Sequence, residues 1–169
     1  EALIMLRASL SCDVVFHYRG APPLVFNRPE VTLVCQPAGL PLTVDITGGV
    51  RQQGIVAVCR ASTFAARYGL LADDLPTVMH DALAGKGALG RIASFPMDHR
   101  IAALVAETID TRLDGELRVL QYAGRLTELV AYTLDAMHHT PSLRGATGHA
   151  LHRRRDVELA HAAMARLEK

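Results

Sequence analysis

Val31-Thr-Leu-Val-Cys-Gln36 decides the fold, because its residue types alternate as they do along a half-buried strand. Successive side chains of a strand point to opposite faces, so Val31, Leu33 and Cys35 share one face. Short apolar stretches of the same kind flank it, and turn residues separate them where a helical pattern would be needed for parallel pairing. The spacing therefore predicts an antiparallel barrel or sandwich over residues 1–60. The flanking stretches are Ala2–Ser9, Val14–Tyr18, Leu42–Ile46 and Gly54–Cys59.

The chain after Arg60 is expected to be helical. Ser62–Tyr68 forms a helix that ends at Gly69, and Asp74–Leu83 forms a second one. Asp98 is the expected N-cap of a third helix, which Gly115 closes. The apolar residues that fall on one face of this third helix are Ile101, Leu104, Val105, Thr108 and Ile109. The fold class is therefore α+β, with a small antiparallel barrel over 1–60 followed by a helical part over 61–139.

Glu116–His139 is the longest predicted helix, and its apolar residues cover a wide arc. An arc of that width can face two surfaces, one of them the rest of the domain. We expect the second surface to be another copy of the chain, since homo-oligomers pair through self-complementary patches. The alternative is a helix buried on two sides within one domain. The residues expected at a dimer interface are Leu120, Ala123, Val130, Leu134 and Met137.

Composition excludes several classes of protein. The 169 residues carry a net charge of +1, and no apolar run approaches the roughly 20 residues of a membrane-spanning helix. Three widely spaced cysteines are typical of reduced thiols in the cytoplasm, where we expect this protein to be. The first residues, Glu1-Ala-Leu-Ile-Met-Leu-Arg7, resemble the middle of a strand, and the natural protein is expected to begin earlier.

No pattern of residues indicates catalysis. The glycines lack the spacing of a phosphate loop, there is no Gly-x-Ser-x-Gly turn, and His17 is the only histidine among the strands. One histidine cannot hold a catalytic metal, so we expect no metal, no cofactor and no enzymatic activity. An apolar barrel with few polar groups instead suits the binding of a small molecule. The residues expected to contact it are Phe16, His17, Tyr18, Leu33 and Cys35, although His17 can also be read as an exposed strand position.

The last thirty or so residues differ from the rest. Residues 140–150 are rich in small and turn-forming residues, and a basic amphipathic helix pattern follows from Leu151. Between Arg144 and Lys169 there are six Lys or Arg residues against three acidic ones, which suits a linker beside nucleic acid. We expect 140–169 to be a linker and the first helix of a further domain.

The order of these elements resembles the sensor half of an AraC/XylS-type transcriptional regulator. Val31–Gly39 and Gln53–Val58 are similar to barrel strands of the siderophore-responsive branch, and Ser62–Gly69 to the helix after its barrel. Leu120–Leu134 resembles the final sensor helix, and Arg155–Leu167 resembles the first scaffold helix of the DNA-binding region.

The resemblance implies a cupin-like barrel that senses an effector, a siderophore or another metabolite, and a helical region that forms a homodimer. DNA would be bound by helix-turn-helix units beyond Lys169, so no base-reading residue is assigned here. Two alternatives remain open at this point. The first is a small cupin-like isomerase or dioxygenase, which metal bound at His17 would favour. The second is a dimeric interaction module that has no effector.

Overall fold

The chain forms two antiparallel sheets and a set of helices, which confirms the mixed class expected from the sequence. The computed structural model describes residues 1–18, 23–76, 79–80, 83–84 and 91–139. Backbone pairing among these residues gives a four-stranded sheet in the order β6-β1-β4-β7 and a three-stranded sheet in the order β3-β2-β5. The first sheet contains β1 (Leu3–Ser11), β4 (Glu30–Gln36), β6 (Gln53–Arg60) and β7 (Arg91–Pro96). The second contains β2 (Val14–Tyr18), β3 (Leu24–Phe26) and β5 (Leu42–Ile46).

Five of these strands follow the apolar stretches of the sequence, and two were missed. β3 has only three residues, too few for an alternating pattern to stand out. β7 lies in the part of the chain that was expected to be entirely helical, and this expectation was wrong. It pairs with β4 from Cys35↔Arg91 to Glu30↔Pro96, as an edge strand. Residues from beyond position 60 therefore complete the sheet that the first sixty residues begin.

The helices agree with the sequence except at the start of the second expected helix and the end of the third. α1 (Ala61–Tyr68) ends at Gly69, whose φ of 64° is the left-handed conformation of a helix C-cap. After a short 3₁₀ turn (Ala72–Asp74), Leu75 and Pro76 are not helical, so the helix expected over Asp74–Leu83 does not begin at Asp74. Part of the remainder of that stretch lies outside the described residues. α3 (His99–Ile109) is capped by Asp98 as expected but ends at Asp110. Gly115 does not close it, because Gly115 is the first residue of α4 (Gly115–His139).

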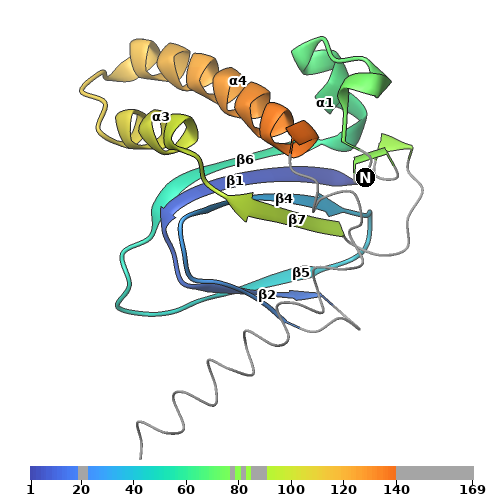
Figure 1. The fold of residues 1–169 in the computed structure, drawn as a ribbon, viewed down its shortest axis with the longest axis horizontal. Helices are drawn as coiled ribbons and strands as arrows, with labels where there is room; N and C mark the ends of the chain where they lie inside the picture. The colour runs from blue at the N-terminus through green and yellow to red at the C-terminus, as the bar shows by residue number, and fades with distance from the viewer. Residues whose placement is uncertain (19–22, 77–78, 81–82, 85–90, 140–169) are drawn as a thin grey trace, which may run out of the picture.

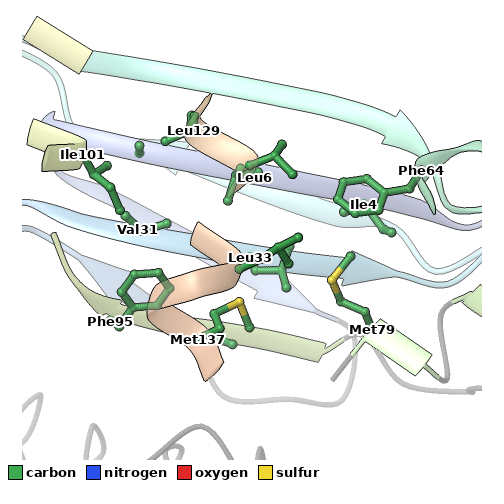
Figure 2. Packing of buried hydrophobic residues seen from close by; sticks show 14 of the residues in the cluster. Ile4, Leu6, Val31, Leu33, Phe64, Met79, Phe95, Ile101, Leu129 and Met137 are labelled. Carbon is green, nitrogen blue, oxygen red and sulfur yellow. The ribbon is translucent and has the colours of Figure 1, made fainter. Parts of the chain in front are cut away.

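The main core lies between the helices and the four-stranded sheet. Figure 1 shows α3 and α4 over one side of this sheet and the strands of the second sheet on its other side. The alternation read from Val31-Thr-Leu-Val-Cys-Gln36 is confirmed, because Val31, Leu33 and Cys35 all belong to this core. Apolar burial of this kind contributes roughly 25 cal/mol per Å². Figure 2 shows the packing, in which the labelled residues are Ile4, Leu6, Val31, Leu33, Phe64, Met79, Phe95, Ile101, Leu129 and Met137.

A second, smaller core holds the two sheets together. Its members come from both sheets, so the two sheets pack face to face, and we call these facing sides their inner faces. The buried members are Cys12, Val14, Phe16, Phe26 and Val34. β1 and β4 therefore contribute to both cores. The side chains on one face of these strands enter the main core, and those on the opposite face enter the second core.

Gly54 is a position where β6 lies too close to β1 to leave room for a side chain. A Cβ added there would lie 2.5 Å from the carbonyl oxygen of Ala8 and 2.9 Å from Cα of Ser9. Gly54→Ala must push β6 away from β1, and we expect a loss of about 1–3 kcal/mol in the free energy of unfolding. Urea denaturation measures it. Gly48→Ala, where a Cβ meets nothing within 4 Å, is the control and should change stability by less than about 0.5 kcal/mol. Equal effects of the two substitutions would contradict the close approach.

Candidate ligand-binding site

Arg7 is the most unusual residue of the inner faces. It lies in the middle of β1, with Thr32 of β4 and Val56 of β6 as its Cα partners on either side. Residues directly opposite each other in antiparallel strands share a face, so these three side chains stand together. The neighbours of Arg7 along β1, Leu6 and Ala8, belong to the core under the helices, so Arg7 points toward the second sheet. A guanidinium is thus placed between two sheets, and it is only 7% exposed.

Two aromatic rings of the second sheet face this guanidinium. The rings of Phe16 and Phe26 are 4.9 Å apart, and the Cζ atom of Arg7 is 5.9 Å from each centroid. Cation–π attraction of this kind is worth roughly 0.5–2 kcal/mol. It does not replace the hydrogen bonds that a buried guanidinium loses with water, which cost several kcal/mol if unmade. Arg7 therefore remains short of acceptors.

Two polar atoms on this face have no hydrogen-bond partner within the described part of the chain. They are Nη1 of Arg7 and Oγ1 of Thr32, and the residue Thr32 is 0% exposed. Buried polar groups are normally satisfied, so two unmet ones on directly paired residues mark a place that can hold a ligand. The acidic side chain nearest along this face of β4 is Glu30, buried and with its Oε2 3.9 Å from Nε of Arg28.

The inner faces of the adjoining edge strands are apolar and open to solvent. Val56 and Val58 of β6 are partners of Arg7 and Met5, so they lie on the inner face, yet they are 57% and 58% exposed. On β5, Val44 and Ile46 are partners of the buried Phe16 and Val14 and are also exposed. We call the set Val44, Ile46, Val56 and Val58 the apolar rim. Because Val56 is beside Arg7, the rim joins the buried guanidinium to solvent.

The sequence predicted only part of this site. Phe16 lies on the inner face as expected, and the side chain of Tyr18 lies outside what the structure describes. Leu33 and Cys35 instead line the main core beneath the helices, because their side chains point to the other face of β4. His17 points away from Phe16, and its Nε2 lies 2.8 Å from Oδ2 of Asp45 without hydrogen-bond alignment. A binding site between the sheets therefore keeps Phe16 and excludes Leu33, Cys35 and His17.

Arg7, Thr32 and Phe26 were not among the expected ligand-binding residues. The sequence does contain an indication that Arg7 is unusual. Arg7 is a charged residue within the apolar stretch Leu3–Leu10, and in a strand its side chain points to the face opposite to that of Ile4 and Leu6. That signal alone does not distinguish an inward-facing arginine from one on a solvated face.

The residues expected at a dimer interface divide into two groups. Val130, Leu134 and Met137 are buried in the chain's own core, where they cannot meet a second copy. Leu120 and Ala123 are exposed. Close to them, Leu117, Leu120 and Gly124 follow one another at helical spacing on α4, and Leu113 lies just before the helix. We call these four residues the outer stripe of α4. They line a groove of about 380 Å³ with Gln121, Arg125 and Glu128.

Polar contacts join α3 to the end of α4. Arg100 Nη2 lies 3.0 Å from Oδ2 of Asp98 and 3.1 Å from Oδ2 of Asp135, and its guanidinium stacks over Tyr132 at 5.1 Å. Nδ1 of His139 donates a 2.7 Å hydrogen bond to the backbone carbonyl of Asp135. The two carboxylates raise the pKa of Arg100 above its usual range. This cluster fixes the C-terminal turn of α4 against the start of α3.

Asp98 provides a test of this junction, because its carboxylate accepts a 2.9 Å hydrogen bond from the N–H of Ile101 as the cap of α3. Burial raises the pKa of Asp98, but its bonds to Ile101 and Arg100 outweigh burial and hold it below the ordinary 3.8. The stabilisation is therefore present at neutral pH and is lost as pH falls below 3.8. Asp98→Ala should cost about 1 kcal/mol at pH 7.

Urea denaturation at pH 7 and at about pH 3 measures the effect, and the difference from wild type should shrink at the lower pH. Asp98→Asn, which keeps a capping oxygen, should cost less than Asp98→Ala at pH 7. A loss that is the same at both pH values would show that the charge of Asp98 is not involved.

Three further features of the chain bear on its function: metal-ligating groups, membrane-spanning helices and the cysteines. The part of the chain that is described contains no group of three or more His, Cys, Asp or Glu side chains able to hold a metal ion. None of its helices is long and apolar enough to cross a membrane. Cys12, Cys35 and Cys59 form no disulfide, and burial raises the pKa of the Cys59 thiol against the opposing effect of Arg67. Comparisons with protein-family models, with curated proteins and with solved structures found no match to this chain.

Proposed function

We propose that this chain is the effector-sensing and dimerisation part of a DNA-binding transcriptional regulator of the AraC/XylS type. The observation that carries the proposal is Arg7, a residue only 7% exposed whose guanidinium faces two phenylalanine rings and has an N–H without an acceptor among the described residues. A group of this kind between two sheets suits recognition of a small molecule. In this proposal the two sheets are the halves of a cupin-like barrel, and the effector, a siderophore or another metabolite, binds between them.

The two cores provide a path from the ligand to the helices. Arg7 and Thr32 face the ligand site, and the residues next to them, Leu6 and Leu33, pack beneath the helices with Leu129 of α4. A ligand that changes the spacing of β1 and β4 on one side therefore changes the packing of α4 on the other. It can shift the protein only by the difference between its affinities for the two arrangements.

The dimer in this proposal forms through the outer stripe of α4. Leu117 and Leu120 are 63% and 71% exposed, and Gly124 leaves room for close approach of a second helix. Polar side chains surround the stripe, among them Arg125, which is paired with Glu107 and Glu128. An apolar centre with a paired polar rim is the usual anatomy of a protein interface. Two copies of the stripe can meet about a two-fold axis.

The experiment that tests the function uses the full-length natural protein in its own cells. Immunoprecipitation of the protein with its crosslinked DNA, followed by sequencing, should recover discrete sites upstream of genes. A reporter driven by such a site should respond to the presence of an effector. The same experiment with a strain that lacks the gene is the control. Uniform recovery of DNA without discrete sites would overturn the proposed function.

A further inference from the structure

We infer that the ligand of this site carries a single carboxylate on an apolar body, and that the carboxylate binds Arg7 and Thr32. The inference rests on the proposed function, because it names the chemical class of the effector. Three properties of the site support it: the donors, the charge balance and the surface beside them.

The donors at the site match a carboxylate. A guanidinium presents its N–H groups in a planar fork, which pairs with the two oxygens of a carboxylate. Nη1 of Arg7 and Oγ1 of Thr32 both lack a partner among the described residues, and their backbones are directly opposite in the register. One carboxylate can therefore take hydrogen bonds from both side chains. A neutral amide of the same shape offers one oxygen in place of two and carries no charge, so it cannot pair with both arms of the guanidinium fork.

The charge balance favours one negative charge rather than two. Arg7 is the buried basic residue of this face, because Arg60 at the end of β6 is 71% exposed and pairs with Glu1. Glu30 stands on the same face of β4, two residues along the strand from Thr32. A phosphate monoester or a dicarboxylate would bring a second charge into a buried space with no second cation beside Arg7 in the described sheets. Placing an unbalanced charge there costs several kcal/mol.

The rest of the ligand must be apolar, because the surface beside Arg7 is apolar. Phe16 and Phe26 cover one side of the guanidinium, and Val56 and Val58 lead outward from it to solvent. An apolar body that covers the rim removes these side chains from water, and each Å² buried contributes about 25 cal/mol. The geometry thus combines a buried anion receptor with an exposed apolar approach.

The test compares each acid with its own amide on the wild-type protein by isothermal titration calorimetry. The probes are benzoate against benzamide and octanoate against octanamide, so that a flat body and a flexible body are both examined. We expect at least one acid to bind ten or more times as tightly as its amide, because hydrogen bonds to a charged group are the stronger ones. Equal affinities of acid and amide would overturn the inference, as would no binding of either acid at concentrations up to about 10 mM.

Three variants test whether the carboxylate of the ligand binds at Arg7 and Thr32. Arg7→Met keeps a long unbranched side chain and removes the charge, so the affinity for the acid should fall to that for the amide. Thr32→Val keeps the shape and removes the hydroxyl, so it should weaken the acid several-fold without changing the amide. Arg100→Met is the matched control, since Arg100 also stacks on an aromatic ring but lies at the junction of α3 and α4; it should leave both affinities unchanged.

The outcomes distinguish failure of the inferred ligand class from failure of the proposed regulatory function. Loss of acid binding in Arg100→Met with full binding in Arg7→Met would overturn the site, because the acid would then be held on the helical surface. If Arg7→Met does not fold, the acid and amide pairs on the wild-type protein and on Thr32→Val decide the inference. Discrete DNA sites together with no acid preference would overturn the ligand class alone, whereas acid preference without DNA sites would overturn the regulator and leave the ligand class standing.

Discussion

Leu120→Glu is expected to convert the proposed dimer of this chain to a monomer. Leu120 is 71% exposed at the centre of the outer stripe of α4, and in a two-fold dimer the substitution occurs twice. Burying a leucine contributes roughly 1.5–3 kcal/mol, so the loss of two such side chains is at least about 3 kcal/mol. The dissociation constant should therefore rise by about 100-fold or more. Sedimentation velocity over protein concentrations from about 1 to 100 μM, a range that spans such a shift, measures it.

Val119→Glu is the matched control for this experiment. Val119 is 68% exposed on the same helix, but it lies roughly on the opposite side from Leu117, since two residues turn an α-helix by about 200°. It should leave the dimer intact. A wild-type protein that is monomeric over the whole range, or a Val119→Glu variant that dissociates as fully as Leu120→Glu, would contradict an interface on the outer stripe.

Leu129→Ala is expected to have the largest effect on stability. Leu129 is fully buried where α4 meets the four-stranded sheet (Figure 2), so its removal leaves a cavity between two packed layers. Substitutions of this kind cost about 2–5 kcal/mol. Because domains unfold with only about 5–15 kcal/mol, a large part of the stability would be lost. Urea denaturation monitored by circular dichroism gives the free energy of unfolding of the variant and of the wild type.

The control for Leu129→Ala is Leu71→Ala, because Leu71 is 72% exposed. This second leucine-to-alanine change should alter stability by less than about 0.5 kcal/mol. If Leu129→Ala were as mild as Leu71→Ala, the packing of α4 on the sheet would be wrong. The same pair of variants also separates core packing from a general intolerance of leucine loss.

The sequence predicted strands wherever residues alternate over five or more positions. Val31-Thr-Leu-Val-Cys-Gln36 fixed both the strand and the face that enters the main core, because an alternating strand has only two faces. β7 escaped because Arg91-Ile-Ala-Ser-Phe-Pro96 lies between segments with helical patterns, not because of its length, since β2 and β5 are shorter. Its place beside β4 depends on a return of the chain over the sheet, which no local pattern contains.

The sequence could not place the functional residues with equal success, and α4 shows why. Its apolar arc is as wide in the first turns as in the last, so periodicity alone treats Leu120 and Leu134 alike. In the structure the C-terminal half of α4 covers the sheet, so Leu134 is buried and Leu120 remains exposed. Only the position of the helix along the sheet separates core from surface.

The ligand site depends on a similar long-range fact. Arg7 is a binding candidate because it faces Phe16 and Phe26, which come from a different sheet. The pairing of β1 with β4 also decides that Thr32 stands beside it. Neither relation is visible within β1, where one charge in an apolar strand is compatible with a solvated edge.

The most direct test of the account is an NMR titration of the full-length protein with methyl groups labelled in Val, Leu and Thr. Benzoate or octanoate, whichever binds more tightly, is added to saturation. The account predicts the largest chemical-shift changes at Thr32 and Val56, with smaller ones at Leu129 across the sheet, because β1 and β4 contact both the ligand and α4. Shifts confined to the outer surface of α4, or no shifts with either acid, would contradict it.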